Sequence, residues 1–310
     1  MSVNFQNEKF NAYFQSVYQD RWASLSLALT QPESQILRKN KYAQAELSDD
    51  FVEVFPGCYY SKSNANVHAQ EDAKGVQVFY KMDPASYFVA RALDVQENET
   101  VLDVCAAPGG KTLILAEALN GTGELVSNEY SNGRRERLLR VLRQYIPHDY
   151  RQNVFVTGKD GNQFGLQNAG KFDRILADVP CSGERHLIEN SLEFAAWTKR
   201  RSENLAIRQY SLLSSAFLAC KEGGRIVYST CSISPLENDD VIKKLKKKRN
   251  VNVLEVDWVK DYSFIEKTEF GYCILPDGFG RGTPASSAVH GDNILNGVGY
   301  GPMYFSIIEK

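Results

Sequence analysis

The stretch TVLDVCAAPGGKT, residues 100–112, joins a short apolar run to a turn that contains two glycines and a lysine. The run has the length of a buried strand, and the residues after the turn, as far as Leu119, form a helical pattern. Further apolar runs follow, namely GELVSNEY, NVFVT, FDRILADV and GRIVYST, with helices expected at 131–146 and 202–220. This alternation predicts a parallel, doubly wound, Rossmann-like α/β sheet.

Residues 1–98 differ from the rest of the chain, because they are rich in Gln, Asn, Tyr and Phe. Helices are expected at 5–19 and 32–47, and a strand at 51–60, so the sequence predicts a mostly helical N-terminal extension. Asp83 and Pro84 then have the pattern of an N-cap and a first helical turn. We therefore expect an accessory region at 1–98 and a second domain at 99–310.

The end of the chain has two further strand-like runs, GYCILP and PMYFSIIE, which could pair at the edge of the sheet. Between them, residues 277–301 are rich in glycine and are expected to form a long loop. Cys220 falls on the apolar side of the helix expected at 202–220, so a core position is expected for it. The sequence around Cys58 and Cys273 indicates no particular role for either residue.

The composition is that of an ordinary globular protein, with 43% hydrophobic residues, 24% charged residues and a net charge of −2. No apolar run approaches the roughly 20 residues that span a bilayer, and the first residues lack a signal-peptide or transit-peptide pattern. We expect no membrane contact and a cytoplasmic location, or the mitochondrial matrix if a presequence is absent from this sequence. Six cysteines without C-x-x-C or Cys/His spacing predict neither a disulfide framework nor a metal site.

Positive charge is concentrated in three segments, at 133–143, 198–208 and 243–249. Each could be the solvated face of a helix. If the three shared one face, they would form a phosphate-binding surface. The sequence leaves both interpretations open.

Polar side chains follow successive strands of the predicted sheet: Asp103, Glu129, Asp160 with Gly161, Asp178 and the segment 229–231. Ligands of doubly wound sheets bind at this edge. The glycine loop has neither P-loop nor dinucleotide spacing, whereas a helix N-terminus with Lys111 favours a carboxylate and Glu129 suits a ribose. The pattern favours S-adenosylmethionine as the ligand, and a capped glycine turn without a ligand is the alternative.

Two cysteines stand where strands of the predicted sheet end, in DVPCSGERH (178–186) and YSTCS (228–232). Together with DVCAAPGGKT (103–112), these segments resemble the Nol/Nop/Sun family of RNA cytosine-C5 methyltransferases, over about residues 80–310. FYKMDPAS (79–86) and GPMYF (301–305) resemble the short branch that includes the mitochondrial small-subunit rRNA enzyme. The resemblance implies an S-adenosylmethionine-dependent methyltransferase fold, with residues 1–98 as an RNA-binding or accessory region.

The resemblance also implies a covalent mechanism. Cys231 would be the nucleophile that adds to C6 of the cytosine, and Cys181 would assist proton removal or product release. Asp178 would hydrogen-bond the cytosine edge and Pro180 would shape the turn that presents Cys181. An electropositive setting for the thiolate could come from Lys111 or Arg185.

The implied binding residues fall into two groups. S-adenosylmethionine, with S-adenosylhomocysteine as product, would be bound by Cys105, Ala106, Pro108, Gly109, Gly110, Lys111, Glu129, Arg134, Asp160, Gly161 and Asp178. The RNA would be contacted by Pro180, Arg185 and His186. For Cys105 the alternative is core packing, for Arg134 a surface helix position, and for His186 a loop-capping role.

The expected partner is RNA, with rRNA favoured over tRNA, and the expected oligomeric state is a monomer. Because the target base must leave its stack to reach a cysteine, we expect single-stranded or loop RNA. One alternative is a non-catalytic ribosome-assembly factor that keeps the fold, and a second is DNA cytosine methylation. The paired Pro-Cys and Thr-Cys motifs disfavour both.

Overall fold

The computed structural model describes residues 7–63, 70–278 and 298–310. The chain divides into two compact units. The first unit holds Met1–Ser34, Val179–Leu213 and Tyr228–Ile308, and the second unit holds Gln35–Asp178, Ser214–Val227 and Glu309–Lys310. The domain boundary expected at residue 98 is not a boundary between the two units, because residues 35–98 belong to the same unit as the strands that follow them. An RNA-binding role for residues 1–98 stays a prediction.

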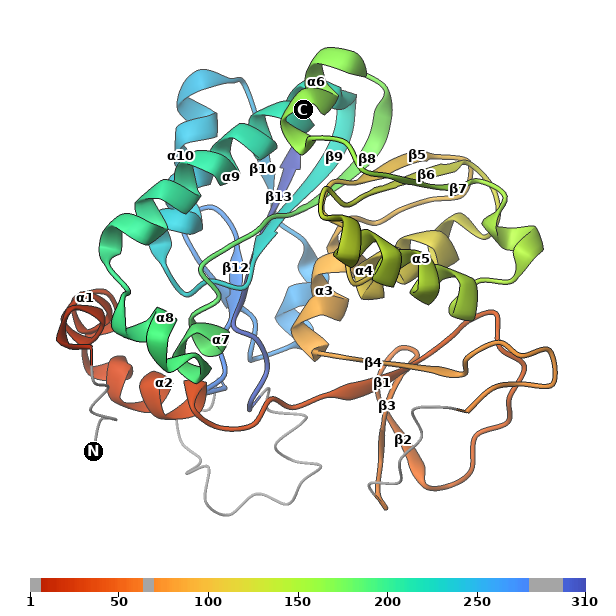
Figure 1. Cartoon of the computed structure of the whole chain (residues 1–310), viewed down its shortest axis with the longest axis horizontal. Helices are drawn as coiled ribbons and strands as arrows, with labels where there is room; N and C mark the ends of the chain where they lie inside the picture. The colour runs from red at the N-terminus through yellow and green to blue at the C-terminus, as the bar shows by residue number, and fades with distance from the viewer. Residues whose placement is uncertain (1–6, 64–69, 279–297) are drawn as a thin grey trace. The chain divides into compact units, whose positions relative to one another are not determined.

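A parallel sheet lies at the centre of the second unit (Figure 1). Its strands are β5 (Thr100–Asp103), β6 (Glu124–Asn128), β7 (Val154–Thr157) and β8 (Phe172–Asp178), in the order β8-β5-β6-β7. Leu102 is fully buried at the centre of β5, where it pairs with Val126 on one side and Ile175 on the other. β9 (Cys220–Thr230) follows β8 in the order, and its residues as far as Val227 belong to this unit. The predicted parallel α/β sheet is confirmed.

Helices connect these strands as the sequence pattern indicates. They are α3 (Pro84–Ala92), α4 (Gly110–Leu119), α5 (Asn132–Tyr145), α6 (Phe164–Gln167) and the 3-10 turns His148–Arg151 and Gly161–Gln163. The side chain of Asp83 caps α3 by accepting a hydrogen bond from the Ala85 amide. Leu138, Leu142 and Tyr145 are buried on one stripe of α5, as expected for a helix that covers a sheet.

The N-terminal part of the second unit is a small antiparallel sheet, so the expectation of a mostly helical extension is wrong. Its strands are β1 (Ile36–Lys39), β2 (Phe51–Phe55), β3 (Cys58–Ser61) and β4 (Phe79–Met82), in the order β2-β3-β1-β4. The helix expected at 32–47 does not form, because β1 pairs on both sides with strands distant in the sequence. The strand expected at 51–60 is a hairpin that turns at Gly57, whose φ of 72° favours glycine.

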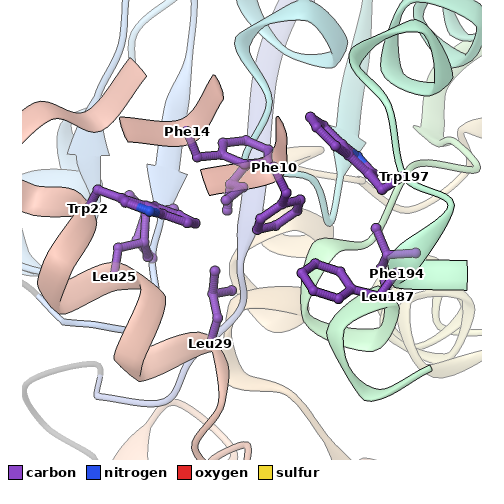
Figure 2. Packing of buried hydrophobic residues seen from close by; sticks show 10 residues of the cluster. Phe10, Phe14, Trp22, Leu25, Leu29, Leu187, Phe194 and Trp197 are labelled. Carbon is purple, nitrogen blue, oxygen red and sulfur yellow. The ribbon is translucent and has the colours of Figure 1, made fainter. Parts of the chain in front are cut away.

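The first unit begins with α1 (Glu8–Tyr18), the 3-10 turn Gln19–Arg21 and α2 (Trp22–Leu29). The helix expected at 5–19 is confirmed, whereas α2 was not expected. Figure 2 shows the aromatic core that these helices share with α7 (Glu184–Glu189) and α8 (Ser191–Ala195). Its buried members are Phe10, Phe14, Trp22, Leu25, Leu29, Leu187, Phe194, Trp197, Ile233 and Leu275. This core fixes α1 and α2 within the unit that carries both motif cysteines.

The remaining elements include the expected helix before β9 and the two expected late strands, together with shorter elements that were not expected. They are α9 (Lys199–Ala219), the 3-10 turns Pro235–Glu237 and Asp257–Asp261, α10 (Asp239–Lys248), β10 (Asn252–Leu254), β11 (Glu266–Lys267), β12 (Tyr272–Ile274) and β13 (Met303–Glu309). The two late strands pair antiparallel, with Cys273 opposite Tyr304, as expected. Cys220 is fully buried as expected, but it begins β9 instead of ending the helix. Most of the expected loop at 277–301 lies outside the described residues.

Two further features concern the described ranges alone. In them, no helix has both the length and the apolar character needed to cross a bilayer. The same ranges hold no group of three or more His, Cys, Asp or Glu side chains arranged for a metal ion.

Candidate active site

A pocket of about 240 Å³ lies at the carboxyl end of the parallel sheet in the second unit. Its lining includes seven of the residues expected to bind a cofactor: Cys105, Ala106, Pro108, Gly109, Gly110, Lys111 and Asp178. The strand-end residue Asp103 lines it as well. The glycine loop, the end of β5 and the end of β8 therefore meet at one cavity, as the strand pattern predicted.

The glycines of this loop are required by close approaches. Gly109 has a φ of 119°, which L side chains rarely adopt. A Cβ on Gly110 would lie 2.6 Å from Cε1 of Tyr80. Tyr80 also lines the pocket and packs edge-on against Tyr145, with ring centroids 5.2 Å apart. The loop can therefore pack against its neighbours in this conformation only while these positions carry no side chain.

Charged groups around the pocket are partly compensated. Lys111 Nζ lies 2.8 Å from Asp178 Oδ2. Asp103 Oδ2 accepts a hydrogen bond from Thr112 at 2.7 Å, but its buried Oδ1 accepts none among the residues that the structure describes. Burial is the main cause that raises the pKa of Asp103 to about 7. A buried acceptor of this kind suits a ligand with a hydrogen-bond donor or a positive charge.

Glu129 is buried directly after β6, in the position expected for contact with a ribose. Its Oε1 accepts a hydrogen bond from the Ser131 amide, and its Oε2 lies 3.4 Å from the guanidinium of Arg134. Arg134 in turn donates to the Ala107 carbonyl of the glycine loop at 2.8 Å. Glu129 and Arg134 are therefore linked to the glycine loop, although neither is a lining residue of the pocket.

The last two residues expected at the cofactor site, Asp160 and Gly161, follow β7. The side chain of Asp160 caps the 3-10 turn Gly161–Gln163 by accepting from the Asn162 amide. The structure places them after a strand of the sheet, as expected, but not in the lining of the pocket. The pocket has lining residues that were not expected, namely Tyr80, Lys81, Met82, Asp83, Ser86, Ala107 and Arg137. The segment FYKMDPAS (79–86) contains most of them and could have indicated them from the sequence.

The two motif cysteines lie together in the first unit. Their Sγ atoms are 2.6 Å apart, both thiols are free, and the Cys231 amide donates to the Cys181 Sγ at 3.1 Å. The hydrogen bond between the thiols is the main cause that raises the pKa of Cys181, followed by burial. Gly183 leaves space beside them, since a Cβ there would lie 3.5 Å from the Cys231 Sγ. The sequence prediction that these cysteines share one site is supported by this geometry.

The three residues expected to contact RNA have different environments. Pro180 is exposed, and its carbonyl accepts a hydrogen bond from Gln209 at 3.0 Å. The His186 side chain is 71% exposed and 3.7 Å from Glu189. Arg185 is buried and donates to the main-chain carbonyls of Ala28, Gly299 and Gly301, which indicates a structural role. Its contact with RNA stays a prediction.

Sequence reasoning missed a pair of buried carboxyl groups next to the cysteines. Glu184 at the start of α7 and Glu237 at the end of the 3-10 turn are both fully buried. They are hydrogen-bonded to Ser182 and Ser232, the residues that directly follow Cys181 and Cys231. One acidic residue close to each cysteine motif was the only signal in the sequence.

Comparison with known proteins places the chain among RNA methyltransferases. A family model described as 16S rRNA methyltransferase RsmB/F matches residues 90–278. The 5-cytosine rRNA methyltransferase NSUN4 of Bos taurus is 37% identical over 250 residues, which are 74% of this chain and 59% of that protein. The mitochondrial tRNA (cytosine(34)-C(5))-methyltransferase of Mus musculus is 30% identical over 263 residues, which are 82% of this chain and 70% of that protein. The chain spans about three fifths of the NSUN4 relatives it matches, 59% and 61% of the bovine and mouse proteins.

Solved structures of Pyrococcus horikoshii proteins share the fold. NSun6 with SFG has a TM-score of 0.71 at 17% identity, covering 98% of both chains. A methyltransferase homolog protein has a TM-score of 0.65 at 22% identity, covering 97% of this chain and 94% of that one. The expected Rossmann-like methyltransferase fold is confirmed. With the family model matched over more than half of the chain, the sequence resemblance is also confirmed: the chain belongs to the Nol/Nop/Sun family of RNA cytosine-C5 methyltransferases.

Proposed function

We propose that the protein methylates carbon 5 of a cytosine in RNA, with S-adenosylmethionine as the methyl donor. The observation that carries the proposal is the pair of free thiols, Cys181 and Cys231, with sulfur atoms 2.6 Å apart. The names of the relatives, which describe 5-cytosine rRNA and tRNA methyltransferases, support the same reaction. A non-catalytic assembly factor would need neither thiol, so that alternative is not favoured.

The pocket residues fit the proposed cofactor. The amide-rich N-terminus of α4 and Lys111 would hold its carboxylate, and Glu129 would hold its ribose hydroxyls. Asp103 Oδ1, which has no hydrogen-bond partner within residues 7–63, 70–278 and 298–310, offers an acceptor for its ammonium group. When bound, S-adenosylmethionine supplies an electrophilic methyl group.

The thiols would supply the covalent chemistry. The Cys231 thiolate forms a bond to C6 of the base, which makes C5 enamine-like and able to take a methyl group. A base then removes the C5 proton, and the electron pair of that C–H bond restores the C5–C6 double bond as the S–C6 bond breaks. The hydrogen bond between the thiols, followed by burial, raises the pKa of Cys181, so Cys181 keeps a proton that it can donate during release. We propose Cys231 as the nucleophile and Cys181 as its partner in release.

Asp178 connects the two sets of residues along the chain. It lines the cofactor pocket, and Cys181 lies only three residues later. We propose that Asp178, which is ion-paired with Lys111, accepts a hydrogen bond from the cytosine amino group.

We propose RNA as the partner, with rRNA favoured over tRNA. A base must leave its stack before its C6 can reach the Cys231 thiol. The first relatives are named rRNA enzymes, and a tRNA enzyme matches over a larger share of its length. The three basic segments remain candidates for phosphate contact, and α5 carries the first of them. Monomeric state and cellular location stay predictions.

The proposal is tested by methyl transfer from S-adenosylmethionine labelled at its methyl group. With unmodified small-subunit rRNA, tRNA and DNA offered separately, we expect label in rRNA and recovery of that label as 5-methylcytidine after digestion. Label in tRNA alone would keep the chemistry and change the substrate. Label at another base position, or no label with any nucleic acid despite cofactor binding, would overturn the proposal.

Replacing Gly110 with alanine should weaken binding of S-adenosylhomocysteine by about tenfold or more. A tenfold loss of affinity corresponds to only about 1.4 kcal/mol of binding free energy. The new Cβ would have to displace the packed ring of Tyr80, which lies 2.6 Å away. Isothermal titration calorimetry measures the effect. Gly133→Ala is the matched control, since it is also in the first turn of a helix and its Cβ would have no heavy atom within 4 Å. Equal affinity of both variants would show that this loop does not bind the cofactor.

A further inference from the structure

The buried carboxyl groups of Glu184 and Glu237 are bridged by a single hydroxyl. Ser182 Oγ lies 2.6 Å from Glu237 Oε1 and also within hydrogen-bond distance of Glu184 Oε1. Both glutamates are 0% exposed, so water does not compensate their charges. Two ionised carboxylates this close would repel each other at low dielectric.

A count of hydrogens shows how many protons the site requires. The Ser182 hydroxyl carries one hydrogen, which can be donated to only one of the two carboxyl oxygens that it faces. If both glutamates were ionised, one short oxygen–oxygen contact would hold no hydrogen. A proton on Glu184 completes the chain, since Glu184 donates to Ser182 and Ser182 donates to Glu237.

The other contacts agree with this assignment. Glu237 Oε2 accepts from the Ser182 amide at 2.9 Å and from Gln209 Nε2 at 2.8 Å. With the Ser182 hydroxyl, Glu237 therefore has three donors, which suits the ionised member of the pair. Glu184 accepts from the Ile233 amide at 2.9 Å and from the Ser232 hydroxyl at 3.0 Å.

Electrostatic interactions also favour a proton on Glu184. Burial, followed by the charge of Glu237, raises the pKa of Glu184 to about 7. The titratable groups that face the pair are Cys181 on the preceding loop, Cys231 on the facing loop, and Tyr13 and Tyr18 from α1. Asp240 from α10 adds a negative charge near Tyr13.

The pair holds both cysteine loops at equivalent points. Ser182 follows Cys181 and is bound through its amide and hydroxyl to Glu237. Ser232 follows Cys231, and its hydroxyl and the next amide are bound to Glu184. The two loops are thereby cross-linked one residue beyond each thiol.

We propose that Glu184 and Glu237 share one proton through Ser182 and act as positioning residues that hold Cys181 and Cys231 together. The positioning role depends on the proposed function. The shared proton does not depend on it. Nothing in the mechanism requires either carboxyl group to touch the substrate. Their role is to hold the two cysteine loops in one fixed arrangement.

The proton is tested by infrared difference spectroscopy of the whole chain. At about pH 6 the wild type minus Glu184→Gln spectrum should show the C=O band of a protonated carboxyl group, and at about pH 8.5 it should lose it. Asp103, whose pKa is also raised to about 7, contributes equally to both proteins and cancels. A difference spectrum without this band at the lower pH would overturn the shared proton, whether or not the protein methylates RNA.

Positioning is tested by the pattern of substitutions. An amide at either position can donate to Ser182 through its NH₂ while the remaining carboxylate accepts, so Glu237→Gln should keep kcat within a few-fold. Glu184→Gln also loses the hydrogen bond that Oε1 accepts from Ser232, a cost of about 1 kcal/mol, so it should keep kcat within about tenfold. Together they leave the Ser182 hydroxyl without a carboxylate acceptor, and kcat should fall about 10²-fold with KM for RNA unchanged. Ser182→Ala, which removes the bridge alone, should lower kcat in the same way if the double variant does not fold.

Glu189→Gln is the matched control, since this glutamate is on the same helix and its side chain is 72% exposed. It should leave kcat and the infrared band unchanged. A double variant or Ser182→Ala with wild-type kcat would overturn the positioning role. An inactive wild type with the band present would contradict the proposed function and keep the shared proton.

Discussion

Replacing Cys181 with alanine should leave the protein covalently attached to its RNA and reduce turnover by about 10³-fold, a loss typical of removing one member of a catalytic set. Cys231 keeps its position at the end of β9 and can still add to the base. Release requires the second sulfur, whose Sγ lies 2.6 Å from that of Cys231 in the wild type. A complex that survives denaturation should therefore accumulate with S-adenosylmethionine and RNA.

Denaturing gel electrophoresis with labelled RNA measures this complex. Cys181→Ala/Cys231→Ala should form none, and Cys231→Ala should neither form it nor transfer a methyl group, although both should still bind S-adenosylhomocysteine. A complex formed by Cys231→Ala but not by Cys181→Ala would exchange the roles of the two cysteines. Unchanged turnover by Cys181→Ala would remove this residue from the reaction.

The parallel sheet could be predicted because its strands are local signals. Val101, Leu102 and Ile175 are fully buried, so each strand is a continuous apolar run that does not depend on its neighbours for recognition. The polar residue after each run then marks the edge where a ligand binds. Most of the residues predicted to bind a cofactor were selected in this way, and seven of them, from the glycine loop to Asp178, line one pocket.

Features that depend on distant partners could not be predicted. The segment around β1 has the Gln, Glu, Ala and Lys content of a helix, and its strand exists only because β3 and β4 pair with it. Glu184 and Glu237 are 53 positions apart, and nothing local indicates that one serine bridges them. Their pairing is a tertiary property, as is the burial of Arg185 beside an exposed His186.

The hairpin at 51–61 was also not predicted, but for a different reason. Its turn, Pro56-Gly57, is a strong local signal that two strands meet there. The apolar pattern on either side of the turn predicts one strand, and this prediction is wrong. Here the sequence contained the information, because only a residue that tolerates a left-handed conformation fits at Gly57.

Replacing Arg185 with methionine should destabilise the first unit by about 3 kcal/mol, since buried acceptors that lose a charged donor cost about 1–3 kcal/mol each. Its guanidinium donates to the carbonyls of Gly301 at 2.5 Å, Gly299 at 3.1 Å and Ala28 at 3.2 Å. Methionine keeps the apolar stem of the side chain but supplies no donor. α7 would thereby lose its attachment to α2 and to the chain segment before β13.

Tryptophan fluorescence during urea unfolding measures this effect selectively, because all three tryptophans, Trp22, Trp197 and Trp258, belong to the first unit. Arg208→Met is the control, since Arg208 is exposed on α9 of the same unit and its loss should change stability by at most about 0.5 kcal/mol. Equal midpoints for the two variants would contradict the structural role. If Arg185→Met kept wild-type stability but lost affinity for RNA, the original expectation of an RNA contact would be restored. The burial of its side chain, 3% exposed, is the reason to expect the first outcome.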